Sequence, residues 1–394
     1  ETAVKNSILG TDPNVLRNLG LPPSIEDNSN PFPNSEGKSR NILSLIQDGS
    51  RFEDEVIKLK SLFHFYDPIH DEGLLFFTSP TWALEDKGKI HLLQNYSFGD
   101  ARDAFYTALT ATSENERKTK FGKTFEALGH VIHHVQDMGQ PQHVRLDDHL
   151  RLDWTQEELP LEKRSRYEQY TKDKGGNLLF GGYGNVSFPT ARSFWTTGRG
   201  EGKGLAEYTN RGFVSAGTNF DDTSGRYPSP ALDPNSAWEA DIRRPDLFPA
   251  ANMPIPLQCQ DDANPCYMTF YRNTVVDSYR PTETKINDKP STWSIFDQDL
   301  KAYNKTYTRT DPDTGQSYTT NQAFSLNRFN FDEAHQFLIP KAVAYSSGLL
   351  DYFFRGKLTA EDAGFTDAGI GLRVKNAIDP KTQSAWQDEG LVIG

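Results

Sequence analysis

The segment from Ser113 to Gly139 constrains the fold more than any other part of the sequence. Ser113-Glu-Asn-Glu116 has the form of a capping box, in which Ser113 and Glu116 satisfy free N–H groups at a helix start. Apolar side chains then recur at helical spacing, at Phe121, Phe125, Leu128, Ile132 and Val135. We therefore predict a long helix with one buried face, ended by Gly139-Gln-Pro141.

Other stretches are also predicted to be helical, and they lie near residues 41–58, 99–112, 156–173 and 331–354. The stretch 175–330 differs, because Gly, Pro, Asp, Tyr and Thr dominate it. We expect a long insertion there, with a short helix near 205–211, a strand at 267–276 and a hairpin around 311–317. The tail after Gly356 lacks helical periodicity and is compatible with the start of a β-rich segment.

Charge and composition exclude some classes of function. A formal charge of -12 disfavours a surface that neutralises a long phosphate backbone, although a metal site can still hold one phosphate. No apolar run approaches the roughly 20 residues that span a bilayer. Cys259 and Cys266 favour a small loop-closing disulfide in a secreted or periplasmic protein, with two buried thiols in a cytosolic protein as the alternative.

Histidines cluster in the middle of the chain, where six of the nine lie between His91 and His149. His133 and Asp137 are four residues apart, so they share one face of the predicted helix, and His143 follows just past the helix-ending turn. This spacing favours metal binding over a solvated helix face. His130 and His134 project from adjacent faces and fit second-shell donors or surface positions better.

A second group of candidate ligands lies earlier, where Asp54 precedes His64-Phe-Tyr-Asp-Pro68 by ten residues. Taken alone, His64 fits a core histidine and Asp54 a solvated helix carboxylate. If both converge on His133 and Asp137, the site has only nitrogen and oxygen ligands, including two carboxylates, which suits zinc.

These motifs resemble the bacterial zinc-dependent phospholipase C family, which shares its fold with the single-strand-specific zinc nucleases. The matching elements are His64-Phe-Tyr-Asp-Pro68, His133-x3-Asp137-x5-His143, Ser165-Arg-Tyr-Glu168 and the helix from Leu338 to Phe354. Together they cover about residues 39–168 and 332–355. The resemblance implies a mainly α fold: a multi-helix phospholipase C/nuclease-like bundle around a metal site, with a long irregular insertion containing short β-strands.

The same resemblance implies a division of the chain and a set of metal ligands. The divisions are a helical metal-binding core (1–174), the insertion (175–330), a closing core helix (331–356) and the tail (357–394). Two or three zinc ions are expected. The ligands of the first zinc would be Asp54, His64, His133 and Asp137, those of the second His143 and Glu168, and Asp137 would bridge to a third.

Several departures from the family pattern affect these expectations. Arg164 stands where the family places a histidine ligand, and His149 is the substitute that we expect in its place. We expect the N-terminal ligands of the third zinc to be missing, because the chain starts at Glu1, beyond the positions at which the family carries them. Glu55 and Ser61 occupy the positions at which choline-selective members carry aromatic residues, so a choline preference does not carry over.

The expected function is zinc-dependent hydrolysis of a phosphoester, phospholipase C-like cleavage of a phospholipid headgroup, with Asp54 orienting or deprotonating the attacking water. One alternative is a single-strand-specific zinc nuclease. Another is a non-catalytic lipid- or surface-binding module stabilised by metal. We expect transient contact with a membrane surface, no stable nucleic-acid complex and a monomer.

Overall fold

The structure is a computed structural model, and the part of the chain that it describes is mainly helical. The described residues are 27–28, 31–55, 60–85, 94–147, 166–174, 182–198, 202–215, 238–241, 267–281, 285–293, 307–310, 317–320, 324–326, 330–355, 358–366 and 369–376. The mainly α class predicted from the sequence is therefore confirmed for these residues.

Helix α6 (Glu114–Asp137) forms the centre of the bundle. Ser113 caps its start, since its side-chain oxygen accepts a hydrogen bond from the backbone N–H of Glu116 at 3.4 Å. The predicted apolar face is buried from Phe121 to Val135. The helix and the capping role of Ser113 match the prediction, while the reciprocal bond from the Glu116 side chain, the other half of the predicted capping box, is not found.

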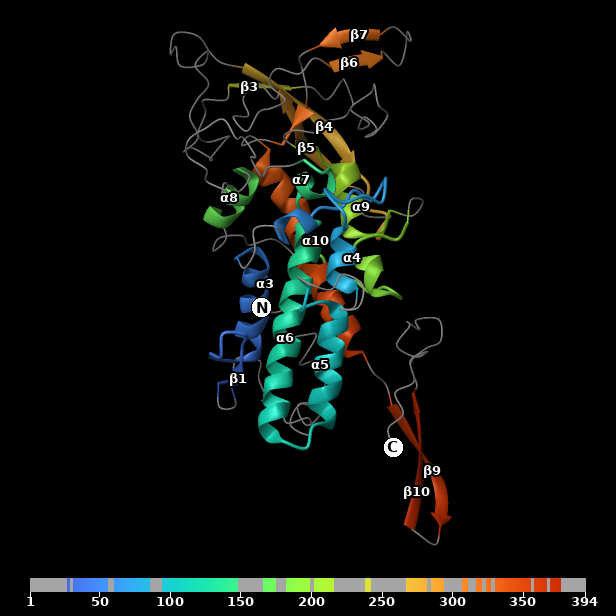
Figure 1. Ribbon diagram of the computed structural model, residues 1–394. Helices are drawn as coiled ribbons and strands as arrows, with labels where there is room; N and C mark the ends of the chain where they lie inside the picture. Colours follow the sequence, from blue (N-terminus) through green and yellow to red (C-terminus); the bar gives the residue numbers. More distant parts are fainter. Residues whose placement is uncertain are drawn as a thin grey trace.

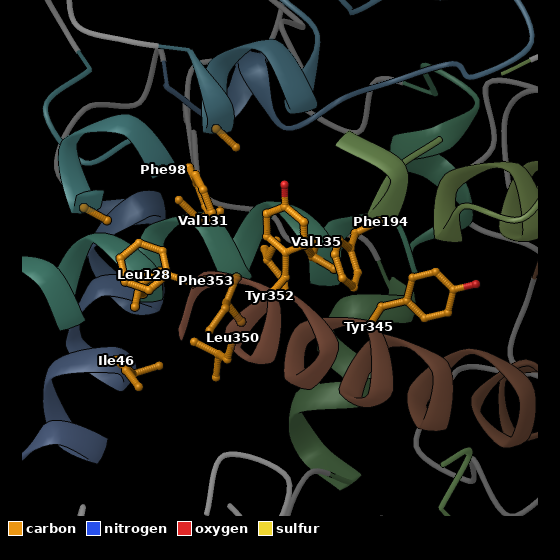
Figure 2. Packing of buried hydrophobic residues seen from close by; sticks show 14 of the residues in the cluster. Ile46, Phe98, Leu128, Val131, Val135, Phe194, Tyr345, Leu350, Tyr352 and Phe353 are labelled. Atoms are coloured by element: carbon orange, nitrogen blue, oxygen red, sulfur yellow. The ribbon is translucent and has the colours of Figure 1, made fainter. Parts of the chain in front are cut away.

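Three further helices pack against α6, and Figure 1 shows α3 and α5 on either side of it. They are α3 (Ile42–Glu55), α5 (Phe98–Thr110) and α10 (Phe331–Phe354). The predicted helix at 99–112 is thus confirmed to within two residues at its end. The helix predicted at 331–354 has those bounds, although Pro340 lies inside it. The apolar residues that these helices share interdigitate in one cluster (Figure 2), with Ile46 from α3, Phe98 from α5, Val131 from α6 and Leu350 from α10.

The contact between α3 and α6 is unusually close at two glycines. A Cβ atom on Gly129 would lie 2.2 Å from the carbonyl oxygen of Ile46, and one on Gly49 would lie 2.0 Å from the carbonyl oxygen of Glu126. No side chain fits at either position, so the two backbones touch directly. One turn further along both helices lie Asp54 and His133, and the glycine contact therefore brings these two residues near each other.

Shorter elements complete the helical part. They are η1 (Lys60–Phe63), α4 (Ser79–Leu84), α7 (Pro141–Val144), α8 (Arg166–Lys174), η3 (Ala191–Phe194) and α9 (Leu205–Gly212). Two of these correspond to predictions, since α8 covers the later part of the helix expected at 156–173 and α9 the one at 205–211. Helices α4 and α7 were not predicted from the sequence. No helix among the described residues is both long enough and apolar enough to cross a bilayer.

The strands are antiparallel and lie mostly in the insertion. A four-stranded sheet has the order β3 (Trp238–Asp241), β4 (Tyr267–Val275), β5 (Lys285–Trp293) and β8 (Phe324–Ser325). Two-stranded pairs are formed by β1 (Phe32–Pro33) with β2 (Ser39–Arg40), β6 (Tyr307–Thr310) with β7 (Ser317–Thr320), and β9 (Leu358–Thr366) with β10 (Gly369–Asn376). The predicted strand at 267–276 is confirmed, and β6 and β7 flank the predicted hairpin turn. Strands β9 and β10 agree with the expected start of a β-rich segment, whereas residues 377–394 lie outside the described part. The division into 1–174, 175–330, 331–356 and 357–394 stays a prediction.

A buried ion pair ties α10 to the segment after β4. Lys341 Nζ lies 2.6 Å from Asp277 Oδ2, and these residues are 3% and 5% exposed. Tyr183 donates a hydrogen bond to the same carboxylate at 2.6 Å. The ammonium group also lies 4.0 Å from the ring centres of both Tyr183 and Tyr208. The lysine is therefore enclosed by one carboxylate and by aromatic rings that favour a cation.

A buried histidine at the start of α10 predicts sensitivity to acid. His335 packs between the rings of Tyr167 and Tyr170, with Nε2 2.8 Å from Thr171 Oγ1. Burial lowers its pKa from 6.5 to about 4. Between these two pH values the unfolded chain takes up a proton that the folded chain does not, so the stability present above pH 6.5 falls toward pH 4. Over this pH range the free energy of unfolding falls by about 3 kcal/mol.

We expect His335→Gln to have a shallower decline in unfolding free energy between pH 6.5 and pH 4 than the wild type. Urea unfolding at several pH values measures this decline for both proteins. Parallel curves for the two proteins would show that His335 does not titrate in this way.

Candidate metal centre

The candidate ligands come from three helix ends and one short turn. Asp54 lies in the last turn of α3, and His64 directly follows η1. His133 and Asp137 stand one turn apart at the end of α6. His143 lies in α7, which begins at Pro141 because a proline fits the first position of a helix, where its missing N–H costs nothing.

Four of these residues surround one point. His64 Nδ1 lies 3.1 Å from Asp137 Oδ2, 3.6 Å from Asp54 Oδ1 and 3.3 Å from His133 Nε2. His133 Nε2 lies 3.5 Å from Asp54 Oδ1 and 3.4 Å from Asp137 Oδ2. Ligand atoms arranged tetrahedrally at about 2.0–2.1 Å from a zinc ion lie about 3.3–3.4 Å from one another. The spacings around His64 Nδ1 and His133 Nε2 therefore fit an ion that these two imidazoles bind together with a neighbouring carboxylate.

Two more predicted ligands adjoin this group. Asp137 Oδ1 lies 3.4 Å from His143 Nδ1, and His143 Nε2 lies 3.4 Å from Glu168 Oε1. Asp137 therefore faces the first group with one oxygen and His143 with the other. Glu168 comes from α8, so a residue about 30 positions beyond the α6 motif reaches the same centre.

The centre is buried on most sides, and one of its carboxylate oxygens lacks a hydrogen-bond partner. His64 and His143 are buried, whereas the Asp54 side chain is 52% exposed, so the centre opens to solvent on the Asp54 side. Asp137 Oδ2 is a buried oxygen that accepts no hydrogen bond. A buried carboxylate oxygen of this kind is normally paired, and a bound cation would satisfy it.

The close approach of carboxylates and imidazoles at this centre shifts their pKa values. Burial opposes the charged form, but the Asp137 and Asp54 carboxylates raise the pKa of His133 to about 10. In the same way Asp137 and Glu168 outweigh burial and raise the pKa of His143 to about 9. Burial would raise the pKa of Asp137, yet the neighbouring imidazoles hold it well below its usual value. Without a metal, protons take the place of the cation for which this arrangement is suited.

Two sets of side chains in the described part of the chain could hold a metal ion: Asp54, His64 and His133, and the fully buried set Glu53, His64 and His134. The chemistry of the donors, imidazole nitrogens with carboxylate oxygens, fits zinc among the divalent ions. The structure thus brings together Asp54, His64, His133, Asp137, His143 and Glu168, as expected from the sequence.

Some predicted residues fall outside the described part, and others are placed differently. His149, Arg164, Cys259 and Cys266 lie outside the described residues, so the expected replacement of Arg164 by His149 stays a prediction. His130 and His134 are 2% and 0% exposed, so the surface position considered for them is wrong. The other expectation, that they donate hydrogen bonds to residues around the ligands, remains.

Sequence reasoning missed Glu53, a fully buried carboxylate bonded to both of these histidines. Its only sequence signal was its place beside Asp54 at the end of a predicted helix.

Comparisons with protein-family models, with curated proteins and with solved structures find no match to this chain. The resemblance to the zinc-dependent phospholipases C therefore remains a prediction from the sequence motifs. The side chains at this centre are therefore what indicates a function.

Proposed function

We propose that this chain is a zinc-dependent phosphoester hydrolase of the phospholipase C type, with the corresponding helical-bundle fold. The observation that carries the proposal is the convergence of Asp54, His64, His133 and Asp137 at the spacing of zinc ligands. His143 and Glu168 beside them supply ligands for a second ion.

Each side chain has a distinct role in this proposal. Zinc ions bound here would act as Lewis acids toward a phosphoryl oxygen and would lower the pKa of water. The buried imidazoles of His64 and His143 hold their positions away from solvent, which keeps the ligand geometry fixed. Among the candidate ligands that the structure describes, Asp54 alone has a largely exposed side chain, so it can orient a water molecule or accept its proton.

The exposure of Asp54 also favours catalysis over a purely structural metal. Structural zinc sites are usually closed by their protein ligands, whereas catalytic sites keep one position open to water. Asp54 is the ligand that water can reach, so a site held by the other three side chains, with water beside Asp54, would be of the second kind. A formal charge of -12 in turn favours a lipid phosphodiester over a polynucleotide as the substrate.

Removal of metal from the purified chain tests this function. We expect elemental analysis to find zinc. We expect hydrolysis of vesicles that contain several phospholipid headgroups, phosphatidylcholine among them, to stop after chelation and to return when zinc is added. Single-stranded DNA, assayed in parallel, should be cleaved much more slowly. Cleavage of DNA alone would favour the nuclease instead, and bound zinc without either activity would favour a non-catalytic module.

A further inference from the structure

Glu53 has no contact with solvent although it is charged. Its side chain is 0% exposed, directly beside Asp54 at the end of α3. A carboxylate in such a position persists only when it is paired or fully hydrogen-bonded, because burying an isolated charge is very costly. The neighbours of Glu53 therefore indicate what the residue does.

These neighbours come from three separate elements around the candidate metal centre. Trp82 Nε1 donates a hydrogen bond to Glu53 Oε1 at 2.9 Å, from α4. His134 Nε2 lies 3.1 Å from the same oxygen, and His130 Nδ1 lies 2.5 Å from Oε2, both from α6. Lys60 Nζ, in η1, lies 3.8 Å from Oε2. One carboxylate thus joins α3, α4, α6 and η1, and two of these helices carry the predicted ligands.

His64 connects this network to the metal centre. Its Nδ1 atom faces Asp54, Asp137 and His133. Its other nitrogen, Nε2, is buried without a hydrogen-bond partner and lies 4.0 Å from Glu53 Oε1. A metal-bound histidine almost always donates its second N–H to a carboxylate, a carbonyl or water, which fixes the ring. Glu53 stands on the side of His64 where that partner is needed.

We propose that Glu53 is a positioning residue for the metal centre. It orients the His64 ring from the Nε2 side and fixes α3 against α6. The inference rests on the metal site of the proposed function and adds a residue outside the predicted ligand set. Glu53 acts through His64 and does not bind the ion. The cation of Lys60 and the N–H of Trp82 already occupy the Glu53 carboxylate, which disfavours a second ion between Glu53, His64 and His134.

The test measures metal binding directly, beginning from the metal-free wild-type protein. Glu53→Gln keeps the shape but replaces one acceptor oxygen with an amide that repels the donors around it. We expect the dissociation constant for zinc, from competition with a chelating dye, to rise about 10- to 100-fold. We also expect the visible spectrum of the cobalt-substituted protein to change, because the His64 ring is no longer fixed.

Glu126→Gln is the matched control. Glu126 is also a buried carboxylate, 1% exposed, on α6, but it accepts its hydrogen bonds from Ser35 N at 2.9 Å and from Ser35 Oγ, away from the metal centre. It should lower stability without changing zinc affinity or the cobalt spectrum. An equal loss of affinity in both variants would overturn the positioning role, since general destabilisation would then explain it.

The remaining outcomes separate the inference from the proposed function. A wild-type chain that binds no zinc contradicts the function itself. A wild type that binds zinc, beside a Glu53→Gln variant of equal affinity and spectrum, contradicts only the inference. Loss of one whole ion with unchanged affinity for the rest also contradicts it, because Glu53 would then be a ligand.

A second variant decides the matter if circular dichroism shows Glu53→Gln to be unfolded. Trp82→Phe removes only the indole N–H and keeps a ring to stack on Phe63, at 4.3 Å between ring centres. It should weaken zinc binding several-fold, and unchanged binding would overturn the inference.

Discussion

Asparagine in place of Asp137 is expected to prevent the chain from retaining either ion of the metal centre after dialysis against metal-free buffer. Asp137 Oδ2 lies 3.1 Å from His64 Nδ1 and 3.4 Å from His133 Nε2, while Oδ1 lies 3.4 Å from His143 Nδ1. Asparagine keeps the size but loses the charge and one oxygen. Because second-shell changes alone cost about 10- to 100-fold in metal affinity, loss of this ligand should cost about 100-fold or more. Elemental analysis and a phosphodiesterase assay measure both effects.

Glu168→Gln separates the two halves of the centre. Glu168 Oε1 lies 3.4 Å from His143 Nε2, on the side of His143 away from the contact of its Nδ1 with Asp137. This variant should lose one ion and keep the one between His64 and His133. Full metal content in Asp137→Asn, or equal losses in both variants, would contradict the central place of Asp137.

The second large effect concerns stability. Lys341→Met is expected to lower the free energy of unfolding by about 3 kcal/mol or more, because it leaves the buried Asp277 carboxylate without its cation. At present this lysine outweighs burial and lowers the pKa of Asp277. Adding Asp277→Asn should recover part of the loss, since the double variant buries no isolated charge. Urea unfolding of the three proteins measures the effect.

Lys174→Met is the matched control for this prediction. Lys174 also pairs with a carboxylate, at 3.5 Å from Asp332, and lies over a tyrosine ring, at 5.1 Å from the centre of Tyr170. Its side chain and that of Asp332 are 36% and 41% exposed, so water screens the pair. The expected loss is below about 1 kcal/mol. Similar losses in Lys174→Met and Lys341→Met would mean that burial does not determine the effect.

The sequence predicted the elements whose patterns are local. The bounds of α10 and the cap of α6 follow from periodicity and from one serine, and both are found in the structure. Helix α4 escaped prediction because it has only six residues, too few for a periodic pattern. Its start depends on Thr78, whose side chain accepts a hydrogen bond from Thr81 N.

The candidate site was also predictable only where its residues are close in sequence. The face shared by His133 and Asp137 follows from helical spacing alone. The approach of Asp54 and His64 to that face required a family resemblance, because no local pattern relates residues about 70 positions apart. Glu53 was beyond both kinds of reasoning. Its role becomes visible only when Trp82, His130 and His134 are seen to bond to one carboxylate.

The two glycines between α3 and α6 have a consequence for how this centre tolerates sequence change. Because the two backbones are in direct contact at these glycines, the separation of the helices does not depend on the size of a side chain at the crossing. Substitutions in the surrounding core can alter stability while Asp54 and His133 keep their spacing. Even a single methyl group at Gly129 would push the helices apart and so change the separation of Asp54 and His133, two residues that Gly129 does not touch.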